Sequence, residues 1–329
     1  MSVEPQPVST PASSAPAPTG ELRSQGNVIA SARRAVLAVP GHDLATLVVR
    51  GADRLSWLNG LVTSDLAHRG EDDATYGLVV GRTGRVVVDV VVVVDASSLY
   101  VVAAGAAMET LRAHLDRYLV MEDVEVTPGD GFESWLLHGP RSVDVLGASR
   151  QAGGAGGLLD RTGLGGAIVV APPPAAASVR EAIVRAVADV GGAIGDDGSW
   201  ETLRLERAVP RFSADFDDKT YPQEAALEKV AVSFNKGCYL GQEVVCMLEL
   251  RGHVKRKLVP LVLETAAAPP PRAEVVDEAG AAVGEVTSAT FSPTLGVAVA
   301  LAMVKRSHCE PGTAVLVRGV RAKVVERPA

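Results

Sequence analysis

Aromatic residues and cysteines are scarce in this sequence of 329 residues. Phe, Trp and Tyr make up only 4% of it, so Val and Ala must fill most of the core. The three cysteines are odd in number and far apart, which argues against a disulfide framework and favours a reducing compartment. Three scattered cysteines are also too few to hold an iron–sulfur cluster within one chain.

Long apolar runs and an excess of positive charge are also missing. The longest apolar run, residues 86–94, contains Asp89 and has about half the length that a helix needs to span a bilayer, so we expect a strand. A formal net charge of −7 argues against a general nucleic-acid coat protein. No basic residue precedes Arg23, which argues against a secretory signal and a transit peptide. We therefore expect a cytoplasmic protein that does not enter the membrane.

Several catalytic and metal-binding motifs are absent. The six histidines show no His-x-x-x-His spacing and no Cys-x-x-Cys pair occurs, so we expect no metal site. The glycine-rich segment 153–157 lacks the Gly-Lys-Ser/Thr ending of a phosphate-binding loop, and we predict a flexible loop there. No Gly-x-Ser-x-Gly elbow or nucleotide fingerprint is present. These absences argue against hydrolases and dehydrogenases.

The patterns that are present predict an α+β fold of two mixed α/β lobes with antiparallel sheets, followed by a small C-terminal β-barrel. Residues 1–26 are rich in Pro, Ser and Ala and are expected to form a disordered tail. Strands and amphipathic helices alternate in residues 27–134, the first lobe, and again in residues 135–254, the second lobe. Residues 255–329 contain short strands separated by turns, which predicts the barrel.

One segment, Lys-Gly-Cys-Tyr-Leu-Gly-Gln-Glu at residues 236–243, combines several chemically active side chains. A helical pattern opens at Pro222 and is predicted to end at Gly237, and a second helix is predicted to begin near Gly241. Cys238 would then lie in a tight loop beside Lys236. A cation and a helix N-terminus both favour thiolate over thiol, so this environment predicts a reactive cysteine. The alternative is a turn in which a small cysteine is simply buried.

This octet resembles the signature of the YgfZ branch of the YgfZ/GcvT folate-binding family. The branch is related to the glycine-cleavage aminomethyltransferase (T-protein) and supports iron–sulfur protein maturation. The resemblance extends from about residue 27 to the end of the chain and is strongest at residues 47–65 and 204–254. It implies the two-lobe fold with a C-terminal barrel and, as cofactor, tetrahydrofolate or a one-carbon derivative of it. It also implies iron–sulfur client proteins and an indirect role in tRNA modification.

The same resemblance marks candidate site residues. Residues 84–89 are similar to a strand that carries an acidic pair in the aminomethyltransferases; here Val88 replaces the first acid and Asp89 remains. Glu206 matches a glutamate that contacts the pterin ring, and a carboxylate can accept two parallel N–H bonds from such a ring edge. We assign Cys238 and Lys236 as the catalytic pair. The folate site is assigned to Asp89, Glu206, Tyr239, Gln242, Glu243 and Arg251.

Three functions remain open at this stage. The first is a tetrahydrofolate-binding accessory factor for the assembly or repair of iron–sulfur proteins, with Cys238 as its working group. The second is a folate-dependent aminomethyl or one-carbon transferase, which Asp89 and Glu206 favour and Val88 and Gln242 disfavour; whether the protein is an enzyme is left undecided. The third is an RNA-binding module. We expect a monomer in each case.

A basic cluster at residues 251–257 follows the octet in an otherwise acidic chain. Its side chains would suit the glutamate tail of folate or the phosphates of a tRNA. A charged edge at a domain junction explains the same pattern equally well.

Overall fold

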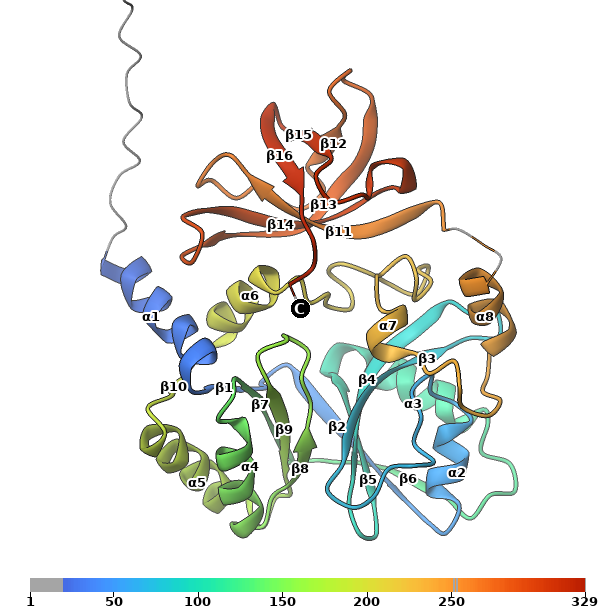
Figure 1. Ribbon diagram of the computed structural model, residues 1–329. Coiled ribbons are helices and arrows are strands. Elements are labelled where there is room, and N and C mark those ends of the chain that lie inside the picture. Colours follow the sequence, from blue (N-terminus) through green and yellow to red (C-terminus); the bar gives the residue numbers. More distant parts are fainter. Residues whose placement is uncertain (1–19, 251, 253, 329) are drawn as a thin grey trace, which may run out of the picture.

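The computed structural model describes residues 20–250, 252 and 254–328. Two lobes, each built on one sheet, lie side by side, and a β-barrel lies across one end of the pair (Figure 1). This confirms the predicted α+β fold class with its C-terminal barrel. Residues 1–19 of the predicted tail lie outside the described residues. Residues 20–26, its remaining part, belong to helix α1 (Gly20–Arg34). Regular structure therefore begins earlier than expected, because Ile29 and Ala32 anchor α1 in a buried cluster and a formed helix extends at little cost.

The first lobe is a five-stranded antiparallel sheet in the order β3-β4-β5-β2-β6. One face packs against its helices and the other faces the second lobe. Strand β4 shows this division, because Val88 and Val90 lie in the helix-facing core whereas Val91 and Val93 lie in the inter-lobe core. The elements are β2 (Leu44–Arg50), α2 (Arg54–Asn59), β3 (Ala74–Val80), β4 (Val86–Val94), β5 (Leu99–Ala104), η1 (Gly105–Ala107), α3 (Met108–Asp116) and β6 (Glu125–Pro128).

The second lobe is a five-stranded sheet in the order β10-β1-β7-β9-β8. Its strand β1 comes from the start of the chain and pairs antiparallel with β7 and parallel with β10. Residues 37–40, which the sequence analysis grouped with the first lobe, thus pair in the sheet of the second lobe. The elements are β1 (Leu37–Pro40), β7 (Glu133–His138), α4 (Ser142–Gln151), β8 (Ala155–Leu158), β9 (Gly166–Ala171), α5 (Ala176–Asp189) and β10 (Ala193–Ile194).

The glycine-rich segment forms part of strand β8 instead of the predicted flexible loop. Gly157 allows the two lobes to approach closely, and Gly156 allows β8 to approach β9. A Cβ atom on Gly157 would lie 2.3 Å from the backbone nitrogen of Ala74, and one on Gly156 would lie 2.3 Å from the carbonyl oxygen of Ile168. Glycine is required at these two positions because of this close backbone approach.

The connection between the second lobe and the barrel contains α6 (Asp197–Glu206), α7 (Glu228–Ala231) and α8 (Gln242–Leu250). The helix predicted from Pro222 to Gly237 is wrong: residues 221–227 form turns, with Ala226 at a φ of 57°, and only the short α7 follows. Helix α8 begins where predicted, but Gly241, with a φ of 77°, is the left-handed glycine at this turn. A Cβ atom there would lie 2.3 Å from the carbonyl oxygen of Gly81.

The octet therefore contacts the first lobe, although the sequence boundaries had grouped it with the second. Leu240 N donates to Gly60 O at 3.0 Å, and Gly241 lies against the β3–β4 hairpin. The physical reason is long-range: small residues at the hairpin and at the octet permit close backbone contact, which no local pattern reveals.

The barrel is closed, in the order β11-β14-β13-β12-β15-β16, and Val and Ala dominate its core. It docks on α6, where Leu205 contacts a cluster that includes Leu258 and Leu301. After β16 the chain returns to the centre of the molecule, between the barrel and the lobes (Figure 1). Within the described residues, no helix has both the length and the apolar character needed to cross a bilayer. The elements are β11 (Arg256–Leu263), β12 (Glu274–Val276), β13 (Ala282–Ser292), β14 (Val297–Lys305), η2 (Arg306–His308), β15 (Ala314–Val317) and β16 (Val320–Val324).

Candidate functional site

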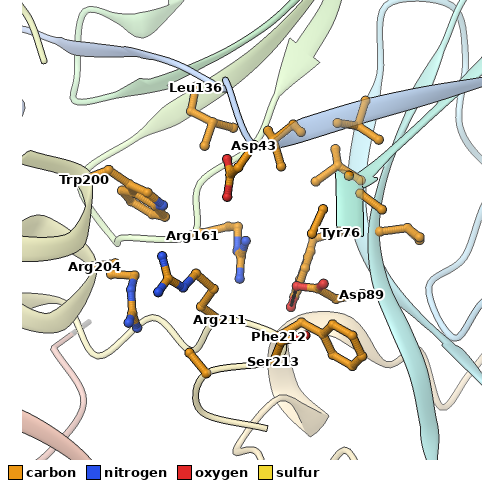
Figure 2. Close-up of a pocket in the computed structure, with 18 of the residues that line it drawn as sticks. Asp43, Tyr76, Asp89, Leu136, Arg161, Trp200, Arg204, Arg211, Phe212 and Ser213 are labelled. Carbon is orange, nitrogen blue, oxygen red and sulfur yellow. Dashed lines mark hydrogen bonds between the residues drawn. The ribbon is translucent and has the colours of Figure 1, made fainter. Parts of the chain in front are cut away.

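A cavity of about 590 Å³ lies between the two sheets. Its lining comes from β4 of the first lobe, from β7 and β9 of the second, from α6 and from the loop that follows α6. In Figure 2, Trp200 forms one wall, Tyr76 and Asp89 form the opposite wall, and Arg161 and Arg211 extend between them. The cavity thus combines flat aromatic surfaces, the carboxylates of Asp43 and Asp89, and cationic side chains.

Asp89 is the one charged residue of β4, and strand alternation places it on the sheet face that borders the cavity. The Tyr76 hydroxyl donates to Asp89 Oδ2 at 3.0 Å. Burial raises the pKa of the Asp89 carboxyl above its ordinary value, while Arg161 and the Tyr76 hydrogen bond act in the opposite direction. This environment suits a carboxyl group that receives N–H donors from a ligand.

The Trp200 side of the cavity is supported by a second aromatic ring, that of His138. The Trp200 ring stacks on His138, with 4.4 Å between the ring centroids and 2° between the planes. Burial, reinforced by the charge of Arg161, lowers the pKa of His138 to about 3, so its imidazole is neutral near pH 7. A neutral ring in parallel contact leaves the opposite face of Trp200 available for stacking inside the cavity.

Arg161 occupies the centre of the site. Its guanidinium carbon lies 3.9 Å from the centroid of the Tyr76 ring, a cation–π geometry, and its Nη2 donates to Pro210 O at 3.2 Å. Arg204 closes the cavity near the barrel and is itself fully buried against Asp215. The cavity can therefore neutralise an anionic ligand as well as hold a planar one.

Of the predicted site residues that the structure describes, Asp89 alone lines this cavity. Glu206 lies at the end of α6 and is engaged elsewhere: its carboxylate accepts hydrogen bonds from Arg33, Ser292 and Thr294. Burial acts to raise the pKa of Glu206, but these donors outweigh it and hold the pKa below its ordinary value. The structure thus gives Glu206 a role in joining α1 and α6 to the barrel.

Lys236 is buried, and its Nζ donates to the carbonyl oxygens of Asn59, Val62 and Ser64 at 2.6, 2.9 and 2.7 Å. Burial lowers the pKa of Lys236 to about 8. Because its three N–H groups donate to these carbonyl oxygens, Lys236 attaches the octet to the end of α2 and the segment that follows it. The predicted pairing of this ammonium with the Cys238 thiol is not among the contacts of the described residues, and Cys238 itself is exposed.

The other octet residues lie away from the cavity. Tyr239 is buried in the inter-lobe core, and Gln242 and Glu243 form the first turn of α8. Arg251 lies outside the described residues. In the basic cluster, Arg256 pairs with Glu224 at 3.2 Å and Lys257 pairs with Glu228 at 2.8 Å, which supports the reading of a charged domain junction there.

Sequence reasoning missed Tyr76, Arg161 and Trp200. Tyr76 and Asp89 fall on the same sheet face because their strands are antiparallel neighbours, so pairing β3 with β4 in register would have indicated their proximity. Arg161 comes from the loop after β8, and Trp200 comes from α6 in the connection to the barrel. No local pattern links either residue to Asp89.

Two family models match this chain, one in its N-terminal half and one at its C-terminal end. Residues 27–153 match the family described as "GCVT N-terminal domain", and residues 256–329 match "Glycine cleavage T-protein C-terminal barrel domain". The chain is 30% identical to an aminomethyltransferase of Rubrobacter xylanophilus, over 87% of this chain and 80% of that protein. It is 29% identical to one of Thermotoga neapolitana, over 91% and 88%.

A solved structure has the same fold. The crystal structure of the glycine cleavage system aminomethyltransferase T from Bartonella henselae superposes with a TM-score of 0.79. The superposition covers 92% of this chain and 89% of that one, at 20% sequence identity.

Proposed function

We propose a folate-binding function for this chain, which belongs to the glycine cleavage T-protein family. The observation that carries the proposal is the position of Asp89 across the cavity from Trp200. A reduced pterin presents a flat ring and an edge of adjacent N–H donors. The indole can stack on the ring while the carboxylate accepts from the edge.

The residues present fit such a ligand. A cavity of about 590 Å³ lies within the size range of small-molecule sites, about 300–1,000 Å³. Asp89 would hold the pterin edge, Trp200 its face, and Arg161 or Arg211 the carboxylates of the glutamate tail. When bound, a tetrahydrofolate supplies an acceptor for one-carbon units; the residues around it bind and orient the ring and exclude water.

Replacing Asp89 with asparagine is expected to weaken tetrahydrofolate binding about ten- to hundredfold, because one charge-assisted hydrogen-bonded contact is lost. Isothermal titration of the purified, folded variant measures the effect. The matched control is Glu206→Gln, which removes a carboxylate of the same family pattern that lies outside the cavity. Equal affinity of Asp89→Asn and the parent would contradict the proposal, and loss in Glu206→Gln alone would move the ligand to the end of α6.

Within this folate-binding role, we assign the protein to the support of iron–sulfur proteins, with Cys238 as its working thiol. Two observations favour this assignment. Cys238 is exposed in a loop that Lys236 attaches to the first lobe. Val88, at the first position of the acidic pair of the transferases, is fully buried in the helix-facing core, so β4 brings one carboxylate, Asp89, to the cavity.

The second candidate is a folate-dependent one-carbon transferase. Asp89 favours it, as do the names of the similar proteins, which are aminomethyltransferases. Glycine-dependent formation of methylene-tetrahydrofolate, measured with the remaining components of a glycine cleavage system, separates the two candidates. Turnover well above the protein-free rate would establish the transferase.

Cys238→Ala is expected to leave folding and folate affinity unchanged but to abolish support of iron–sulfur enzymes in cells, since the exposed thiol contacts neither core nor cavity. Complementation of a deletion strain is the measurement, with Cys246→Ala as control. In parallel, mass-resolved iodoacetamide labelling should modify Cys238 before Cys309, whose thiol pKa is raised by burial. A fully active Cys238→Ala protein would remove the thiol from the mechanism.

A further inference from the structure

A second cavity, of about 240 Å³, adjoins the first. The two share Tyr76 and Arg161, so one guanidinium borders both spaces. The second cavity lies where β3, the loop after β8 and the segment before α7 meet the end of the chain. Its charged lining consists of Arg69, Asp160, Arg161 and Arg327.

Arg327 reaches this place because the chain turns back after β16. The segment descends from the barrel to the junction of the lobes (Figure 1), where Arg327 Nη1 donates to Ala226 O at 3.4 Å. The side chain is half-buried. Burial, together with the nearby charge of Arg161, lowers the pKa of Arg327 below its ordinary value. Arg327, which is distant in sequence from Arg161, thus places a second cationic side chain in the same cavity.

The lining contains three arginines and one aspartate, so its positive charge exceeds its negative charge. The Asp160 carboxylate is directed to its own loop, where it accepts from the backbone N–H groups of Thr162, Gly163 and Gly165 at 2.8–2.9 Å. Burial acts to raise the pKa of Asp160, and these donors hold it below its ordinary value. The other carboxylate that faces Arg327 belongs to Glu228, which is paired with Lys257.

Among the residues that the structure describes, neither Arg161 nor Arg327 forms an ion pair with a carboxylate. Two half-buried guanidinium groups that line the same small cavity repel each other, and an anion between them would relieve the repulsion. The planar fork of each group also matches the oxygen geometry of a carboxylate or a phosphate.

We propose that the second cavity is an anion subsite, which takes a carboxylate or phosphate group between Arg161 and Arg327. The group has two possible sources, and they share the same chemistry. It is either the tail of a ligand whose ring occupies the first cavity, which rests on the folate-binding proposal, or a free small anion. In the first case, Arg161 links the two parts of one ligand, and the chain terminus takes part in recognising its tail.

The first experiment titrates inorganic phosphate into the ligand-free full-length protein and follows binding by calorimetry. Arg327→Gln is expected to weaken phosphate binding about tenfold, because one charge-assisted contact is lost. Arg321→Gln is the matched control: it removes the same charge from an exposed position on β16 that lies outside the cavity. This arm needs no folate, so its outcome is independent of the folate-binding proposal.

The second experiment compares tetrahydrofolate with tetrahydropteroate, which lacks the glutamate and its carboxylates. If the tail occupies the subsite, the parent binds tetrahydrofolate more tightly, and Arg327→Gln removes this preference without weakening tetrahydropteroate binding. A preference that persists in Arg327→Gln, with phosphate weakening in the first experiment, identifies a free anion as the occupant. If neither compound binds the parent, the folate-binding proposal fails while the phosphate titration still decides the subsite. Phosphate binding that is absent or unaffected in Arg327→Gln, together with an unchanged tail preference, overturns the proposal.

Discussion

Replacing Arg204 with methionine is expected to destabilise the ligand-free protein by about 3–5 kcal/mol, because it leaves the buried Asp215 carboxylate without its cation. Arg204 and Asp215 side chains are both fully buried, with Nη1 and Oδ2 2.7 Å apart. The same guanidinium donates to Ser288 Oγ of the barrel at 3.0 Å and to Val209 O at 3.2 Å. Its removal therefore breaks a contact between α6, the following loop and β13.

Urea denaturation, followed by far-ultraviolet circular dichroism, measures this loss. The control is Arg141→Met, which removes an arginine from an exposed ion pair with Asp144 and should cost less than about 1 kcal/mol. A double variant with Asp215→Leu should recover part of the stability, because no unpaired charge then remains in the core. A loss for Arg204→Met no larger than that of the control would show that the buried network contributes little.

Lys236→Met is expected to cost about 3–5 kcal/mol near neutral pH, because three charge-assisted hydrogen bonds are lost and three carbonyl groups lose a donor. The pKa of about 8 lies above the pH of the experiment, so the parent ammonium carries all three N–H donors. Lys229→Met is the control in the same connection, since Lys229 is exposed and forms no side-chain hydrogen bond among the described residues.

The variant should also release the octet from the segment after α2. Amide hydrogen exchange at residues 236–241 is expected to quicken in Lys236→Met and to remain unchanged in Lys229→Met. Unchanged exchange with full stability would mean that the three carbonyl contacts do not hold this loop. If exchange is unchanged but stability is lost, the three hydrogen bonds stabilise the end of α2 and the segment after it, and not the loop at residues 236–241.

Local patterns were sufficient for much of the fold. The β3–β4 hairpin follows from two valine-rich strands around a Gly-containing turn, and the barrel follows from short strands without helical periodicity. The alternation of β4 also explains why Asp89, which the family resemblance had marked, borders the cavity between the sheets. These predictions succeed because alternation and turn chemistry act over a few residues, which is the range that a single sequence reveals.

Residue roles that depend on distant partners were decided only by the tertiary structure. Glu206 resembles a ligand-binding glutamate in sequence, yet Arg33, Ser292 and Thr294 surround it. Lys236 was expected to activate a thiol, but its ammonium is bound by carbonyl groups of the first lobe.

Chain connectivity was equally beyond local patterns. The amino-acid order by itself determined the strands, most of the helices and the barrel. Only the tertiary structure decided that β1 joins the second lobe and that Arg161 and Trp200 face Asp89. The physical reason is that a buried polar group is satisfied by whichever donor or acceptor the packing brings close, and packing joins segments that are far apart along the chain.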